Sequence, residues 1–223
     1  MKQIFAGEVY EILPLSNGIL FSYNREELDD NVLVAYKMIS FDNGRFTDVA
    51  KNVYLITKFG NNYKAVVSKC DNYITVKSIL LPNGKVFLLS ANGSAQLLDT
   101  DASVIWTGDL IYRSCVPSDI VLYDNALWAS YAECNTLLKY NLATMREELR
   151  IGGGANSPFD KPRDIFLEGD NAMISNQGSK KLLQINLTSY KLFEYESFDE
   201  AISQYVKVAD NRFAILESGL YLI

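Results

Sequence analysis

The feature that most constrains the fold is a strand pattern that recurs about every forty residues. In each copy an apolar strand leads into a tight turn, rich in Asn, Asp or Gly, and a second apolar strand then ends on a polar residue. The copies span residues 15–22, 81–90, 123–130, 169–175 and 209–217. Repeats of this length with several short strands are typical of β-propellers, in which each repeat forms one four-stranded blade.

We therefore expect an all-β fold, a single β-propeller domain over residues 1–223, with five four-stranded blades and six blades as the alternative. The expected repeat units are about 8–49, 50–115, 116–160, 161–200 and 201–223, the last completed by residues 1–7. Both ends of the chain look strand-like. We expect N- and C-terminal strands to share one blade and close the ring, because closure removes exposed strand edges.

The second unit is longer than the others and leaves residues 52–71 over. Two apolar runs in this stretch flank the sequence Gly60-Asn61-Asn62. Turn residues between two such runs predict an additional β-hairpin.

Composition argues against several classes of function. The chain has no histidine, which removes Ser-His-Asp and Cys-His catalytic groups and His-ligated zinc. The net charge is −6 and basic residues are scattered, so a nucleic-acid partner is not expected. No apolar run approaches the ~20 residues of a membrane-spanning helix, and a membrane partner is not expected either.

The cysteines indicate a reducing compartment. Cys70, Cys115 and Cys134 are odd in number and far apart, a poor framework for disulfides. The chain reaches Glu8 before an apolar secretory segment could form. We expect a soluble, cytoplasmic monomer.

Two segments resemble a known group of propellers. The sequence Ile151-Gly152-Gly153-Gly154, with the segment 158–165 that follows it, resembles the passage between blades of NHL-repeat propellers. The segment 174–182 resembles a hairpin of NHL and streptogramin-lyase-like propellers. The resemblance is strongest over residues 116–190 and implies an architecture rather than an activity.

The innermost strand of each blade begins at one mouth of the central channel. Counting five or six residues back from each turn gives the positions expected there: Glu11, Ser78, Asp119, Asp164 and Tyr205. Converging carboxylates suit Ca²⁺ or Mg²⁺, and Glu11, Asp119 and Asp164 are the candidate metal ligands. Similarity to SMP-30-like propellers would imply an axial cation that polarises a lactone. The alternative is that Asp119 and Asp164 accept backbone hydrogen bonds in turns.

A second ring of polar residues ends the strand after each turn, at Ser22, Ser90, Ser130, Ser175 and Glu217. The candidate ligand-binding residues in and beside these rings are Tyr131, Glu133, Asn176, Gln177, Tyr205 and Glu217. Polar and aromatic walls suit a sugar or a peptide end. The alternative is that small hydroxyl groups simply fit a crowded position.

Two functions follow as expectations. The first is a non-catalytic binding or interaction propeller that recognises a small polar ligand or a protein at the channel mouth. The alternative is a divalent-cation-dependent hydrolase or lactonase of SMP-30-like type with axial carboxylates. Without histidine the serines lack an obvious base, which favours the binding role.

Overall fold

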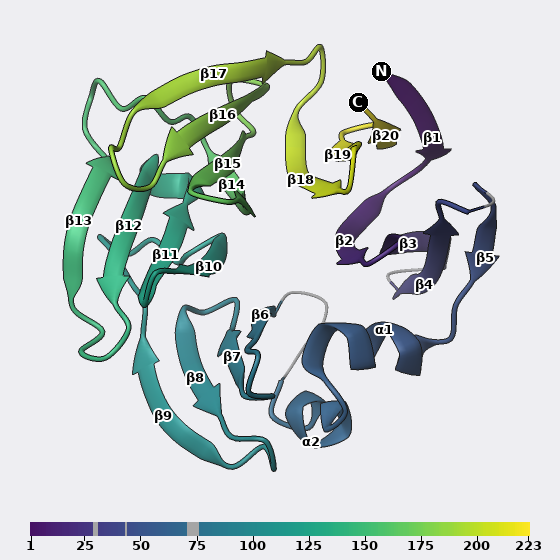
Figure 1. The fold of residues 1–223 in the computed structure, drawn as a ribbon, viewed down its shortest axis with the longest axis horizontal. Coiled ribbons are helices and arrows are strands. Elements are labelled where there is room, and N and C mark those ends of the chain that lie inside the picture. The colour runs from purple at the N-terminus through teal and green to yellow at the C-terminus, as the bar shows by residue number, and fades with distance from the viewer. Residues whose placement is uncertain (29–30, 43, 71–75) are drawn as a thin grey trace.

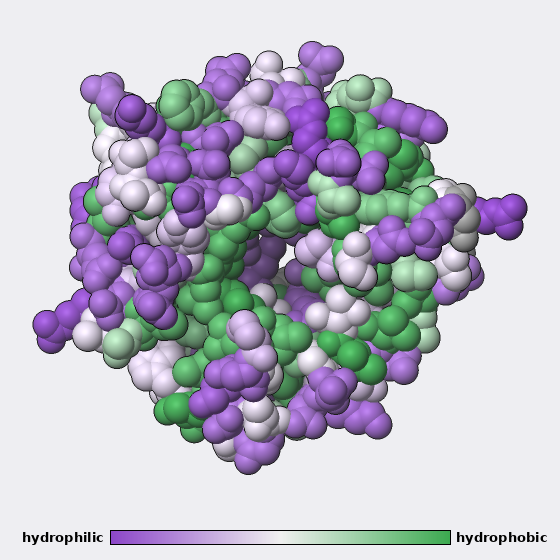
Figure 2. Space-filling view, viewed as in Figure 1, coloured by the Kyte–Doolittle hydropathy of each residue, from purple (hydrophilic) through white to green (hydrophobic). Residues whose placement is uncertain are grey.

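The computed structural model describes residues 1–28, 31–42, 44–70 and 76–223. In this part of the chain, five four-stranded antiparallel sheets stand around a central axis (Figure 1). The expected five-bladed β-propeller is confirmed, and the six-bladed alternative is wrong. Figure 2 shows a hollow at the centre of the ring.

Within each blade the strands run from the axis outwards in chain order, except for the last strand of the fifth blade. The first blade contains β2 (Val9–Leu15), β3 (Gly18–Leu28), β4 (Asn31–Ser40) and β5 (Phe46–Asp48). The second contains β6 (Lys77–Leu80), β7 (Val86–Leu89), β8 (Ser94–Leu98) and β9 (Val104–Asp109). The third contains β10 (Asp119–Tyr123), β11 (Ala126–Tyr131), the 3₁₀ turn η1 (Ala132–Cys134), β12 (Thr136–Asn141) and β13 (Glu147–Gly152). The fourth contains β14 (Pro162–Glu168), β15 (Asn171–Asn176), β16 (Lys181–Asn186) and β17 (Leu192–Ser197).

The fifth blade joins the two ends of the chain. It consists of β18 (Ile202–Val208), β19 (Asn211–Leu216), β20 (Gly219–Leu222) and β1 (Lys2–Ala6). The N-terminal strand β1 is antiparallel to β20 and pairs Lys2 with Leu222 and Phe5 with Leu220. The two termini therefore lie side by side (Figure 1), and the expected closure by strands from both ends is confirmed.

The hairpin expected over residues 52–71 is wrong, because two helices form there. They are α1 (Lys51–Phe59) and α2 (Tyr63–Val67), and residue 71 lies outside the described residues. Among the described residues, no helix has the length and apolar character needed to cross a membrane.

The side chains that α1 buries explain why this segment is helical. Tyr54, Leu55 and Phe59 are buried, whereas Ile56 remains exposed. Spacings of one and four residues place these three side chains on one helix face. Gly60 has a φ of 80° and its N–H donates to the carbonyl of Ile56 at 2.8 Å. Its positive φ, which glycine adopts without a steric penalty, ends the helix, so this glycine is a helix stop rather than a hairpin turn.

Apolar side chains fill the spaces between neighbouring blades. Trp128, which is 1% exposed, packs with Ile174 between the third and fourth blades. Between the first and second blades the cluster is different, because α1 contributes Tyr54 and Phe59 between Leu20 and Leu88. The helical insertion thus acts as a wedge at one of the five blade junctions (Figure 1).

Candidate functional site

One polar side chain from the innermost strand of each blade belongs to a ring at one end of the channel. The five residues, here called the axial ring, are Glu11, Lys77, Asp119, Asp164 and Gln204. In three of these strands the register shifts just before the axial residue, between Val9 and Glu11, between Pro162 and Asp164, and between Ile202 and Gln204. Such irregularities re-aim a side chain, and here they recur at the same place in the repeat.

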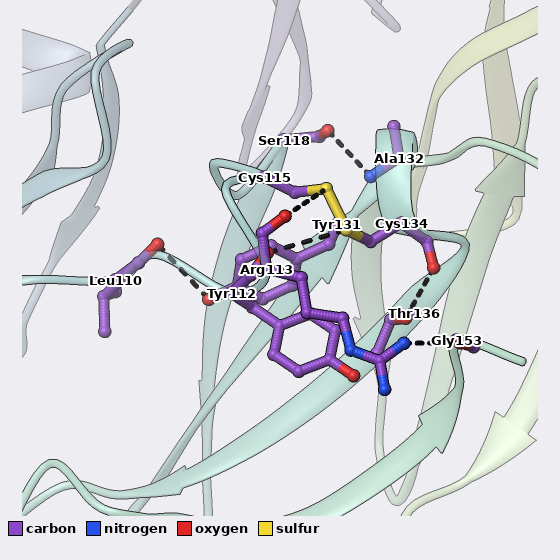
Figure 3. Close-up of a disulfide and its surroundings, with 10 residues drawn as sticks. All are labelled: Leu110, Tyr112, Arg113, Cys115, Ser118, Tyr131, Ala132, Cys134, Thr136 and Gly153. Atoms are coloured by element: carbon purple, nitrogen blue, oxygen red, sulfur yellow. Dashed lines mark hydrogen bonds between the residues drawn. A yellow bond between two sulfur atoms is a disulfide. The ribbon is translucent and has the colours of Figure 1, made fainter.

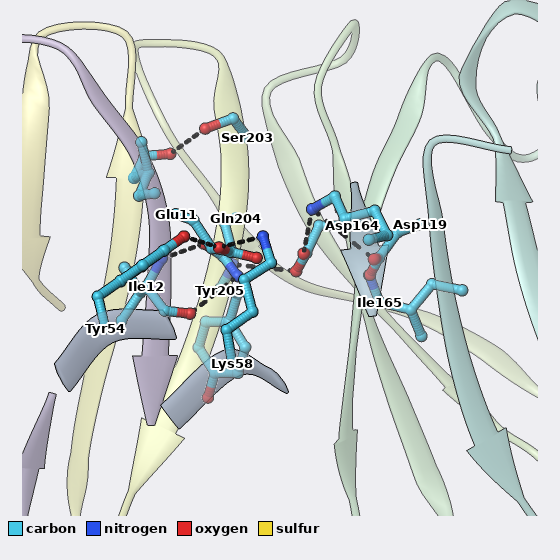
Figure 4. Close-up of polar contacts among 12 residues, drawn as sticks. Glu11, Ile12, Tyr54, Lys58, Asp119, Asp164, Ile165, Ser203, Gln204 and Tyr205 are labelled. Atoms are coloured by element: carbon cyan, nitrogen blue, oxygen red, sulfur yellow. Dashed lines mark hydrogen bonds and ion pairs between the residues drawn. The ribbon is translucent and has the colours of Figure 1, made fainter. Parts of the chain in front are cut away.

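Three axial residues bond to the innermost strand of the next blade (Figure 4). Asp119 Oδ2 accepts a hydrogen bond from the Ile165 N–H at 2.9 Å, and Asp164 Oδ2 accepts one from the Tyr205 N–H at 3.4 Å. Gln204 both accepts from the Ile12 N–H at 2.7 Å and donates to the Ile12 carbonyl at 3.2 Å. Asp119 and Asp164 therefore do accept backbone hydrogen bonds, but from the neighbouring blade rather than from their own turns.

Glu11 makes a different contact because α1 lies beside it. Its carboxylate lies 2.7 Å from Lys58 Nζ and also accepts a hydrogen bond from the Tyr54 hydroxyl (Figure 4). The Lys58 side chain is only 2% exposed. Burial by itself would raise the pKa of Glu11, but Lys58 and Lys77 together hold that pKa below its usual value. Glu11 and Lys58 thus form a buried ion pair.

Lys77 lies among the remaining carboxylates. Its Nζ is 3.7 Å from Asp119 Oδ1 and 4.0 Å from Asp164 Oδ1, and 29% of its side chain is exposed. Burial would lower the pKa of Lys77, but Asp119, Asp164 and Glu11 raise it overall. Burial is the first cause that raises the pKa of Asp164, and repulsion from Asp119 is the second. The ring therefore holds a lysine between two acids whose ionised forms are disfavoured.

Two of the five positions expected at the channel mouth are corrected by one residue. Lys77 stands in the ring where Ser78 was expected, and Gln204 stands where Tyr205 was expected. Side chains alternate between the two faces of a strand, so a shift of one residue exchanges the faces. Ser78 instead donates to the carbonyl of Lys58 at 3.4 Å.

Three of the residues expected to bind a ligand are buried. Tyr131 and Tyr205 are 0% exposed and Asn176 is 2% exposed. The Tyr131 hydroxyl lies 2.6 Å from that of Tyr140, the Tyr205 hydroxyl donates to Glu168, and Asn176 accepts a hydrogen bond from the Asp160 N–H. The polar atoms of these three side chains therefore bond to other groups of the protein, and their binding of a ligand stays a prediction.

The other three candidates lie at the surface of this mouth. Glu133 and Glu217 are exposed and Gln177 is half-buried. Each follows the second strand of its blade, whose end pairs with the start of the innermost strand. Three serines of the second ring, Ser22, Ser130 and Ser175, instead oppose Glu11, Asp119 and Asp164 in the ladders and are buried.

The expected metal ligands come together only in part. Glu11, Asp119 and Asp164 all belong to the axial ring, but the ammonium groups of Lys58 and Lys77 lie among them. In the part of the chain that the structure describes, no group of three or more acidic or cysteine side chains has a geometry that could hold a metal ion. The positive charge beside these carboxylates comes from lysine.

A disulfide lies at the same mouth, contrary to the expectation of free thiols. Cys115 and Cys134 form this bond (Figure 3), and Cys70 is not part of a disulfide. Cys115 precedes β10 and Cys134 follows β11, and antiparallel pairing places these two ends together. The disulfide could have been predicted from the pairing of the two strands that the cysteines flank, although not from the spacing of the cysteines alone.

These features define a five-bladed β-propeller with a charged axial ring, and solved propellers share its fold. A streptogramin B lyase matches with a TM-score of 0.52 at 13% identity, covering 100% of this chain and 70% of that one. A virginiamycin B lyase from Staphylococcus aureus matches with a TM-score of 0.51 at 11% identity, covering 100% and 72%. The computationally designed Ika4 protein matches with a TM-score of 0.52 at 8% identity, covering 69% of this chain and 94% of that one.

At these identities the similarity shows the fold alone. The resemblance to streptogramin-lyase-like propellers is confirmed as a likeness of architecture. No protein-family model matches the sequence, and a search of curated proteins finds no significant match.

Proposed function

We propose that this protein is a non-catalytic binding propeller whose ligand, a small polar molecule or a protein segment, docks at the mouth that carries the axial ring. The observation that supports this function is the chemical asymmetry of the ring. Asp119, Asp164 and Gln204 repeat one hydrogen bond to the next blade, whereas Lys77 breaks the repetition and keeps 29% of its side chain exposed. Closure of the ring does not require a lysine at this position.

The surface of this mouth favours a ligand with a positive charge or many hydrogen-bond donors. Glu133 and Glu217 are exposed there, and Gln177 adds an amide. The chain as a whole carries a net charge of −6. Carboxylates at a rim attract cations and steer their approach.

Thermal melts with monosaccharides, spermidine and a short lysine-rich peptide test this function. A ligand that binds the folded state raises the melting midpoint, and we expect at least one of these probes to do so. The rise should be lost in a Glu133→Gln, Glu217→Gln double variant and kept in the charge-matched Glu148→Gln, Glu194→Gln control. Equal responses of the two variants, or no response in the wild type, would contradict binding of such ligands at this mouth.

The alternative, a divalent-cation-dependent hydrolase or lactonase, is supported by the meeting of Glu11, Asp119 and Asp164 in one ring. An ion at the axis would have to displace the ammonium of Lys77 from the two aspartates. Melts with millimolar Ca²⁺ or Mg²⁺ separate the two functions. A midpoint that rises with the cation, and that Asp119→Asn abolishes, would favour the enzyme.

A further inference from the structure

The helical insertion and the second blade line an open pocket at the far end of β6 from Lys77. Its volume is about 690 Å³, and its floor contains Phe59, Val66 and Val86, each no more than 2% exposed. Binding pockets for small molecules usually measure about 300–1,000 Å³ and have mostly apolar linings. This pocket has both properties.

Two large apolar side chains stay exposed at the walls of this pocket. Ile56 of α1 is 38% exposed and Leu80 of β6 is 43% exposed. Gly60 lies beside Leu80, since a β-carbon at that position would lie 3.2 Å from Leu80 Cδ1. An aromatic ring suits such a surface, because it has two flat apolar faces and can pack against aliphatic side chains and the edge of Phe59.

The rim of the pocket is polar and rich in hydrogen-bond acceptors. It contains Asn61, Asn62, Asp99 and Thr100. The Asn62 amide donates to the carbonyl of Thr100, which ties the insertion to the second blade. The Asp99 side chain is 41% exposed. Its Oδ1 accepts a hydrogen bond from the Thr100 N–H at 2.8 Å and forms an ion pair with Lys85 Nζ at 3.8 Å, which leaves Oδ2 for a ligand.

We propose that this pocket binds a small aromatic amine, with the ring on the apolar floor and the ammonium group at Asp99. The floor offers apolar contact, and the rim offers a carboxylate and amide oxygens. The protein's net charge of −6 disfavours an anion at the same place. This site is separate from the axial ring and does not depend on the function proposed for it.

Tryptamine and indole-3-acetate test the proposal because they share a ring and differ in charge. Isothermal titration should show tryptamine binding about three-fold more tightly, the ratio that a weak surface ion pair supplies. Asp99→Asn should remove this preference, whereas Asp101→Asn, outside the pocket lining, should retain it. Equal binding of the two compounds by the wild type overturns the proposed class of ligand.

A second pair of variants tests the location. Ile56→Trp fills the pocket and should abolish tryptamine binding. Val53→Trp is the matched control, because Val53 lies on the same helix, is 44% exposed and is not part of the lining. Both substitutions are at exposed positions, so circular dichroism should show unchanged folding. Binding that survives Ile56→Trp, or no binding of tryptamine by the wild type, overturns the site.

Discussion

Four of the five junctions between neighbouring blades of this propeller are of two kinds. From the third blade through the fourth and fifth to the first, an axial side chain bonds to the main chain of the next innermost strand, as Asp119 does to Ile165. Between the first and second blades, α1 takes the place of that bond and offers Lys58 to Glu11. One kind of junction repeats, and the other is an exception built from a helix and a buried ion pair.

The difference between the two kinds of junction separates residues that hold the ring closed from residues that are available for binding. A bond that recurs in three junctions at the same position serves the ring. The departures from repetition are Lys77 and the insertion, and each lies beside a candidate binding feature, the charged mouth in one case and the pocket in the other. Three of the next four predictions test these junctions and one tests the disulfide of the third blade, from the largest expected effect to the smallest.

Loss of one charge should destabilise the junction of the first and second blades more than the repeated junctions. Lys58→Met removes the ammonium group that lies 2.7 Å from the Glu11 carboxylate, and we expect the free energy of unfolding to fall by about 3–5 kcal/mol. Urea unfolding measures this change, with Lys64→Met on the exposed face of α2 as the control. A Glu11→Gln, Lys58→Met double variant should recover much of the loss, and a double variant no more stable than Lys58→Met would refute the coupling.

The second largest effect on the free energy of unfolding should come from loss of the disulfide in the third blade. Its cysteines are separated by 19 residues, and a loop of this size corresponds to about 3 kcal/mol of stabilisation in the chain-entropy account. Cys115→Ser with Cys134→Ser should lower the unfolding free energy by about that amount. Cys70→Ser is the control. Insensitivity of the wild type to dithiothreitol would show that the bond does not stabilise the fold.

Loss of the repeated hydrogen bond should lower the free energy of unfolding by a moderate amount that is similar at each of these junctions. Asp119→Ala leaves the Ile165 N–H without its acceptor, and we expect a loss of about 1–3 kcal/mol. Asp119→Asn keeps an oxygen acceptor and should cost less. Gln204→Ala at the junction of the fifth and first blades should cost an amount similar to Asp119→Ala. Widely different values would show that the junctions are not equivalent.

The effect on pH dependence should be the smallest when it is counted per pH unit. The folded state raises the pKa of Asp164 above its unfolded value, so the folded state binds the proton more tightly. Stability from this group is therefore present at low pH and falls as the pH rises from about 4 through the folded pKa, by at most about 1.4 kcal/mol per pH unit. Asp164→Asn should remove this slope in urea melts between pH 4 and 8.

Glu11 provides the opposite control in the same ring. Its pKa is lowered in the folded state, so its contribution is present above the unfolded value of about 4.3 and is lost as the pH falls. Glu11→Gln should reduce the loss of unfolding free energy below about pH 4 and leave its dependence at higher pH unchanged. The same pH dependence in the two variants would contradict the opposite pKa shifts of Glu11 and Asp164.

Much of the fold could be predicted from the sequence because the repeat is local. An apolar strand, a turn and a second strand can be recognised in a window of about ten residues, and five copies predict five blades. The axial positions of Glu11, Asp119 and Asp164 also follow from counting along each copy. The prediction of axial positions for Ser78 and Tyr205 was wrong, because one bulge or one shortened strand exchanges the two faces of a strand.

The helical insertion could not be assigned with the same pattern. Residues 53–57 are apolar and partly β-branched, which favours a strand when they are considered alone. Their burial at the junction of two blades, with Tyr54 and Phe59 facing inward, favours the helix. Tertiary packing overrides a weak local preference in such a segment.

The sequence by itself determined the forty-residue repeat, the closure of the ring by both ends of the chain and the exclusion of histidine chemistry. The tertiary structure alone decided that Lys77 joins the acids at the axis, that Cys115 meets Cys134, and that the insertion leaves a pocket beside the second blade. Local patterns depend on residues that are neighbours along the chain. Charges, cysteines and pocket walls meet across blades, and their distances exist only once the ring has closed.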